Sequence, residues 1–169
     1  MILPKVRDPR LVTIRRGGTL PDTDHQLLTL WAADCTEHVL PLFEAAVPSD
    51  DRPRKAIEAA RAWTRGELKM SESRSAAFAA NAAANDLKGA AREAAHSAGQ
   101  AAAVPHVPEH YLGAAAYAIK AARAAASPEE SDEAGRLERD WQIARIPEHL
   151  LELVLEDQRR RNDICWGVF

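Results

Sequence analysis

Apolar residues recur along most of the chain at the three- and four-residue spacing of a helix, not at the alternate positions of a strand. The longest stripe follows Pro21 and includes Leu27, Trp31, Cys35 and Leu42. Turn-forming and helix-capping residues divide the pattern into about seven helical segments. Thr23 and Ser71 are the predicted N-caps of the first and third segments. We expect these segments to begin near Thr23, Asp51, Ser71, Ala90, Glu109, Pro128 and Pro147.

The first twenty residues have a different pattern. The run LVTIRR is rich in β-branched residues and is followed by Gly17 and Gly18, which predicts a short extended arm over residues 1–20. Residues 21–169 would then form a single helical domain. We predict an all-α fold of about seven helices, arranged as stacked antiparallel helix pairs or as a compact orthogonal bundle. The segment after Glu109 is apolar on both faces, so its helix should be surrounded by protein.

Composition changes the picture of the core and of the partners. Hydrophobic residues make up 46% and aromatic residues 5%, and alanine is abundant, which favours closely packed helices. A formal net charge of -3 argues against general nucleic-acid binding. Neither a secretory signal nor a membrane span is expected, because charges interrupt the apolar runs. Cys35 and Cys165 lack metal-type spacing, so we expect reduced thiols in a cytoplasmic protein.

Histidines supply the sharpest polar pattern. Three pairs of polar residues are four positions apart, and each pair shares one face wherever its segment is helical. The pairs are Asp34 with His38, His96 with Gln100, and His106 with His110, and Tyr117 completes the candidate polar cluster. Carboxylates are sparse around these pairs, so we expect no bound metal and no cofactor.

Two interpretations of the histidines remain open. In the first, His38 lies in the core and Asp34 accepts a hydrogen bond from its ring. In the second, Asp34 and His38 face His106 and His110 across a pocket, and the protein is a small helical enzyme or ligand-binding protein. We expect no nucleophilic catalysis, because Cys35 on the apolar stripe would be a buried, inert thiol.

The C-terminal region is the candidate partner-binding region. Three consecutive arginines offer planar donors to an acidic partner, and the apolar tail ICWGVF must either dock into the domain or contact a second copy of the chain, as in a homodimer. The candidate contacts are Arg159, Arg160, Arg161, Asp163 and Trp166.

Several strings of the sequence carry a family resemblance. They are WAADCTEHVLPLFE, AIEAARAW, AAFAANAAA, HVPEHYLGAAAYAIKAAR and RNDICWGVF. Together they resemble a family of small all-helical bacterial proteins described as immunity proteins of polymorphic-toxin systems. The resemblance implies a protein without catalytic residues that binds a cognate toxin and blocks it. Under this resemblance the histidines and Asp34 would be structural.

Overall fold

The computed structural model describes residues 3–169, and this part of the chain forms seven α-helices and no β-strand. The α-helices are α1 (Asp22–Ala46), α2 (Arg52–Thr64), α3 (Met70–Ala83), α4 (Gly89–Ala103), α5 (His110–Ala125), α6 (Ser131–Ile143) and α7 (Leu151–Arg161). Short 3-10 helices are η1 (Pro9–Leu11), η2 (Ile14–Arg16), η3 (Glu148–Leu150) and η4 (Asp163–Cys165). The all-α class predicted from the sequence is therefore confirmed.

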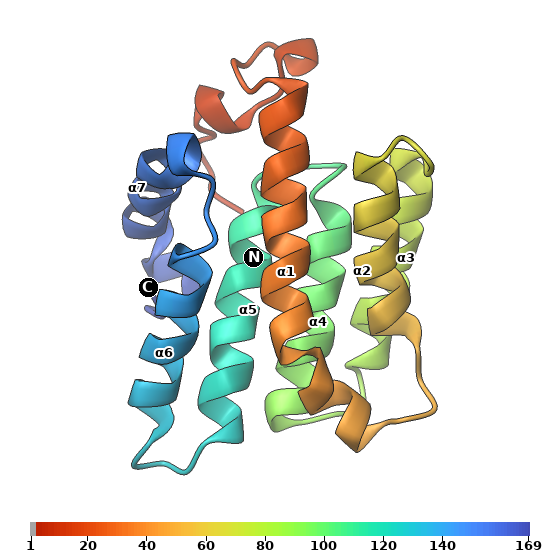
Figure 1. Ribbon diagram of the computed structural model, residues 1–169, viewed down its shortest axis with the longest axis vertical. Helices are drawn as coiled ribbons and strands as arrows, with labels where there is room; N and C mark the ends of the chain where they lie inside the picture. Colours follow the sequence, from red (N-terminus) through yellow and green to blue (C-terminus); the bar gives the residue numbers. More distant parts are fainter. Residues whose placement is uncertain (1–2) are drawn as a thin grey trace.

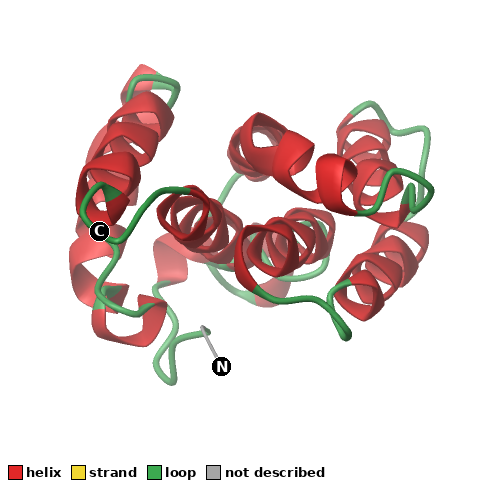
Figure 2. Ribbon diagram, turned by 90° about the horizontal axis from the view of Figure 1, so that it is seen from below, coloured by secondary structure: helices red, strands yellow, loops and turns green. Residues whose placement is uncertain are grey.

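Helices α1 to α6 run up and down along the long axis of the molecule, each opposite in direction to the one before it (Figure 1). Helix α4 contacts α1, α2, α3 and α5, while α5 also contacts α1 and α6. Seen end-on, α2 and α3 flank this centre on one side and α6 and α7 flank it on the other (Figures 1 and 2). Of the two arrangements we predicted, the structure has the antiparallel one.

Alanine determines the packing at the centre. Alanine is the commonest residue on the buried faces of α4 and α5, with Ala98 and Ala115 fully buried among them. Small side chains let the two helix backbones approach closely, and Gly99 allows an even closer approach to α3. A Cβ atom on Gly99 would lie 2.5 Å from Nδ2 of Asn81. Helix α5 is buried on most sides, as its two apolar faces predicted.

The larger core side chains come from helices around this centre. Leu28, Trp31 and Phe43 project from α1, and Tyr111 and Leu112 from the start of α5. The indole Nε1 of Trp31 donates a 2.9 Å hydrogen bond to the carbonyl oxygen of residue 142 on α6. Each of these large side chains buries more apolar area than an alanine does, and therefore contributes more to the stability of the fold.

The N-terminal segment corrects one prediction. The LVTIRR region forms η1 and η2 with a single bridge between Thr13 and Leu20, so it is not an extended arm; residues 1 and 2 of the predicted arm lie outside the described residues. Leu11 and Leu20 are buried in the core. Short turns pack these two side chains inward, which a β-branched composition alone does not reveal.

Ion pairs tie this segment to distant parts of the chain. The guanidinium of Arg7 donates two hydrogen bonds of 2.6 Å to the buried carboxylate of Glu109. Arg10 pairs with Glu156 on α7 at 2.8 Å, and Arg160 lies 3.6 Å from Asp8. The N-terminal segment is therefore held against the start of α5 and against α7.

Two predicted caps are also wrong. Helix α1 begins at Asp22 with Pro21 as its N-cap, so Thr23 lies inside the first turn. Helix α3 begins at Met70 after Lys69, whose backbone N–H donates to the Glu72 carboxylate, so Ser71 is not the cap. Both helices start within two residues of the predicted positions, because the apolar periodicity fixes the segment more firmly than the cap does.

Candidate functional site

The structure separates the histidines that the sequence pattern grouped. Asp34 and His38 share a face of α1 but do not pair: Asp34 Oδ1 accepts a 2.7 Å hydrogen bond from Arg61 Nη2. His38 Nδ1 instead lies 2.6 Å from Oε2 of Glu138 on α6. The side chain of His38 is 41% exposed, so the predicted core histidine with an Asp34 partner is wrong.

His38 is part of an aromatic and charged site between α1 and α6. The His38 ring stacks on the Trp141 ring with centroids 3.7 Å apart. The guanidinium carbon of Arg145 also lies 3.7 Å from the Trp141 ring centroid. The carboxylate of Glu138 is buried beneath, and its Oε1 accepts a 2.9 Å hydrogen bond from Gln142. A histidine oriented by a buried carboxylate can exchange a proton, but it needs a substrate or nucleophile beside it.

Within the described part of the chain, no thiol or hydroxyl side chain lines the pocket beside His38. Cys35, three residues earlier on α1, is fully buried, and this burial raises the pKa of its thiol well above the ordinary value. A thiol held protonated in an apolar environment is a poor nucleophile. The predicted burial of Cys35 is confirmed. Cys165 is also buried, and both thiols are free.

The other histidines lie in different places. Nδ1 of His110 pairs with Oε1 of Gln100 at 2.7 Å, which joins the start of α5 to α4. Burial, together with the charge of Arg161, lowers the pKa of His110 to about 4, so the ring is neutral at physiological pH. A neutral ring bonded inside the fold has a structural role. His106 lines a separate cavity beside the N-terminal segment.

The single histidine-lined pocket of the alternative interpretation is therefore not formed. His38, His106 and His110 have different neighbours and line no common cavity among residues 3–169. Within the same described range, no group of three or more His, Cys, Asp or Glu side chains could hold a metal ion.

At the C-terminus the three arginines have different environments. Arg161 is buried, and its guanidinium donates to Asp157 Oδ2 at 2.8 Å and to the backbone oxygen of Glu109 at 3.0 Å. Arg160 donates to the other oxygen of Asp157 at 2.6 Å. Arg159 is exposed. Of the three predicted contacts, Arg161 therefore cannot reach a partner and belongs to the core.

The same buried network includes an aromatic hydroxyl. The Tyr111 hydroxyl donates to Asp157 Oδ2 at 2.8 Å, so that oxygen accepts from α5 and from α7 together. Burial and the adjacent carboxylate raise the pKa of Tyr111 well above its ordinary value. Asp157 thus fixes the position of α7, which leads into the C-terminal tail.

Trp166 is the most unusual residue of the tail. Its φ angle is 60°, the left-handed region, and it is the one non-glycine residue with a positive φ in the described chain. Its side chain remains 45% exposed although the tail around it is docked, with Cys165 buried and Phe169 packed against the core. The left-handed backbone at this position holds a large aromatic side chain partly in solvent.

Neighbouring side chains fix the indole of Trp166. Lys120 Nζ lies 3.9 Å from the ring centroid, and the ring of Tyr117 lies 4.8 Å away. Tyr117 in turn contacts His96 at 5.2 Å, and Nδ1 of His96 bonds Asn81 Oδ1 at 3.0 Å. We call His96, Tyr117, Lys120 and Trp166 the C-terminal aromatic cluster.

The C-terminal aromatic cluster contains residues that we predicted to belong to two separate groups. His96 and Tyr117 come from the predicted polar cluster, and Trp166 from the predicted partner contacts. Lys120 was missed, although it lies three residues after Tyr117 on the same helix. The cavity beside Trp166 measures about 320 Å³ and is also lined by Glu93, whose carboxylate lies 3.0 Å from Lys120 Nζ.

The architecture places the protein among small all-helical bundles, and Trp166 is the exposed member of its C-terminal aromatic cluster. Residues 18–149 match the family described as "Imm-5 like putative immunity protein", and the chain belongs to that family. No curated protein and no solved structure matches the chain significantly. Among the described residues, no helix is long and apolar enough to cross a membrane.

Proposed function

We propose that this protein binds a cognate bacterial toxin through the C-terminal aromatic cluster and neutralises it by covering a surface that the toxin needs. Membership of an immunity-protein family supports the class of partner. The exposed, conformationally strained Trp166 is the observation that carries the location of the interface.

The strain at Trp166 supports a binding role. A left-handed conformation costs a non-glycine residue about 1–2 kcal/mol, and asparagine or glycine would adopt it more easily. Contacts with Lys120 and Tyr117 offset part of this cost while leaving nearly half of the side chain exposed. Partly exposed, rigid tryptophans are enriched among the residues that dominate protein–protein affinity.

The surroundings of Trp166 match the anatomy of an interface. Ile164 is 39% exposed, two residues before Trp166, and adds apolar surface. Arg159 and Asp163 are exposed nearby in the chain and can form a polar rim. Neutralisation by coverage needs no catalytic group, which agrees with the inert environment of Cys35.

The test uses affinity capture followed by a growth assay. Wild-type protein, Trp166→Ala and Phe78→Ala serve as baits in a lysate of the source organism, and proteins retained by the wild type are identified by mass spectrometry. Phe78 is the matched control, because it is an exposed aromatic (63%) on α3, at the opposite edge of the molecule from the C-terminus (Figure 1). Each retained protein is then expressed alone and with each variant.

We expect a retained protein that arrests growth when expressed alone and is tolerated with the wild type or Phe78→Ala. Loss of an interface tryptophan should weaken binding by about 2 kcal/mol or more, roughly thirtyfold, so Trp166→Ala should fail to protect. Protection by Trp166→Ala equal to the wild type would move the interface elsewhere. Absence of growth arrest by every retained protein would overturn the toxin partner itself.

A further inference from the structure

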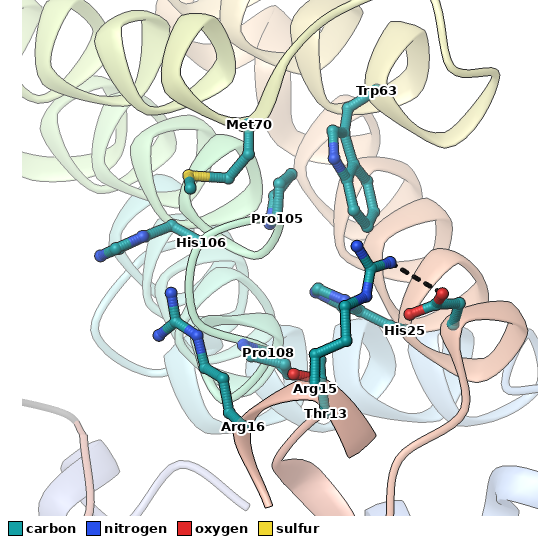
Figure 3. A pocket seen from close by; sticks show the side chains of 10 residues that line it. Thr13, Arg15, Arg16, His25, Trp63, Met70, Pro105, His106 and Pro108 are labelled. Carbon is teal, nitrogen blue, oxygen red and sulfur yellow. Dashed lines mark hydrogen bonds and ion pairs between the residues drawn. The ribbon is translucent and has the colours of Figure 1, made fainter.

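A second cavity, of about 200 Å³, lies where the N-terminal segment meets the helical bundle (Figure 3). Its walls come from five parts of the chain that are far apart in sequence. They are η2, the start of α1, the end of α2, the start of α3, and the connection between α4 and α5. The C-terminal aromatic cluster contributes no residue to it.

Two arginines stand at the mouth of this cavity. The guanidinium of Arg15 is held by Asp22 at 2.7 Å, and only one of its nitrogens is used in that bond. The guanidinium of Arg16 extends toward His106 and has no hydrogen-bond or ion-pair partner among residues 3–169 (Figure 3). Arginine guanidiniums beside a concave site can donate several hydrogen bonds to a tetrahedral oxyanion.

His106 adds an unfulfilled hydrogen-bonding group. Its Nδ1 atom is buried without a partner, although buried polar atoms are normally satisfied. Burial and the charges of Arg74 and Arg16 lower the pKa of this ring, and His110 is a further titratable neighbour. The ring therefore lies in a positive environment that a bound anion would neutralise.

The opposite wall of the cavity is apolar. Trp63, Met70, Pro105 and Pro108 provide it (Figure 3). The Nε2 atom of His25 is not available to bind a ligand, because it forms a 2.8 Å hydrogen bond with the backbone oxygen of residue 104. Cavities that bind drug-sized ligands measure about 300 Å³ or more, so this one suits a smaller molecule.

We propose that this cavity binds a phosphate group, held by Arg15 and Arg16 at the mouth and by His106 after a small rotation of its ring. The phosphate is either free or carried on a small apolar body that packs against Trp63. This inference is independent of toxin binding, since it uses a different surface of the molecule.

The test is calorimetric titration of the purified full chain with inorganic phosphate and with phenyl phosphate. We expect a dissociation constant of about 1 mM or tighter for at least one of them. Arg16→Gln should weaken binding about tenfold or more, because a charge-assisted donor is lost. Arg159→Gln is the matched control, an exposed arginine that also has no side-chain partner among the described residues, and it should leave affinity unchanged.

The two probes distinguish the source of the phosphate. Tighter binding of phenyl phosphate indicates an apolar carrier, whereas equal affinities indicate free phosphate. Nuclear magnetic resonance of the histidine ring protons supplies a second readout: phosphate at the proposed site should raise the pKa of His106. The proposal is overturned by the absence of binding, by equal weakening in both arginine variants, or by binding that leaves His106 unperturbed.

Discussion

The α4–α5 pair lies at the centre of the molecule and helix α7 lies at one edge, and the two regions are held by different interactions (Figure 1). Between α4 and α5 the contact is made mostly by alanines such as Ala98 and Ala115, with side-chain hydrogen bonds added by Ser97 and Gln100. Helix α7 is fixed by charge, with Asp157 and Arg161 both about 1% exposed in their side chains and bonded to one another. The α4–α5 contact depends on the small volume of its side chains, whereas α7 depends on the pairing of its buried charges.

This difference predicts how each region responds to substitution. A close contact between small side chains tolerates polar changes at its edge but not additional volume. A buried ion pair is sensitive to the loss of either partner, because the remaining charge stays desolvated. The match to the immunity-protein family covers α4 and α5 and ends before α7, so the charged region lies outside the matched residues.

The largest effect is expected from Arg161→Ala. This change leaves Oδ2 of the buried Asp157 carboxylate without its cation, while Arg160 still donates to Oδ1, and it also removes the bond to the backbone of Glu109. We expect a loss of about 3–5 kcal/mol in the free energy of unfolding, measured by urea denaturation. Arg159→Ala, at an exposed position, should stay within about 0.5 kcal/mol of the wild type. A loss below about 1 kcal/mol for Arg161→Ala would show that charge does not hold α7.

A slightly smaller loss of stability is expected when the pH is lowered, because of His110, which lies where the two regions meet. Its pKa is about 4 in the folded protein and 6.5 when unperturbed, so only the unfolded chain gains a proton as the pH falls from 6.5 to 4. Stability is therefore complete above pH 6.5 and declines through this window, by up to about 3 kcal/mol. Burial also lowers the pKa of His25 and His96, which adds loss in the same direction.

The measurement compares urea denaturation at pH 7 and pH 4.5 for the wild type, His110→Gln and His149→Gln. The His110 variant should lose less stability on acidification than the wild type, because it has one fewer histidine that protonates on unfolding. His149 is an exposed histidine that pairs with Asp24, and its variant should resemble the wild type. Identical pH dependence in all three proteins would contradict the role of His110.

The smallest effect is expected from Gly99→Ala in the alanine-rich centre. The added Cβ would come within 2.5 Å of Asn81, whose amide is held by bonds to His96 and to the backbone of residue 77. Overpacking costs about 1–3 kcal/mol, and the better helix propensity of alanine returns about 1 kcal/mol. We expect a net loss of about 1 kcal/mol in thermal or urea unfolding.

Gly135→Ala sharpens this result as a control. The new Cβ would meet Cγ and Cδ of Arg123, a partly exposed side chain whose guanidinium pairs with Asp132. The better helix propensity of alanine should offset most of the cost of shifting this side chain, so stability should stay within about 0.5 kcal/mol of the wild type. If both glycine variants were equally stabilised, close packing of α3 against α4 would not limit the size of the residue at position 99.

The helices were predictable because their signals are local. Apolar spacing and punctuation by proline and glycine placed all seven segments, and the two apolar faces of the segment after Glu109 indicated a central helix. The exact starts of α1 and α3 were missed, since several polar residues near each start could act as caps. The turns of η1 and η2 were missed because residue type alone favours extended structure there.

The candidate site was less predictable because its contacts are distant in sequence. His38 and Glu138 are 100 residues apart, and no local pattern distinguishes Glu138 from the nearer Asp34. The run of three arginines likewise gave no sign that Arg161 is buried. Trp166 was recognisable as an outlier in an apolar tail, but its neighbours Tyr117 and Lys120 required the fold.

The ion pairs between the N-terminal segment and distant helices have a consequence for biosynthesis. Arg7 bonds a residue 102 positions away, and Arg10 pairs with Glu156 on the last helix. While the ribosome is still making α7, the N-terminal segment has already emerged and has only part of its native partners. Docking of η1 against α7 must therefore be a late folding event, completed after synthesis of that helix.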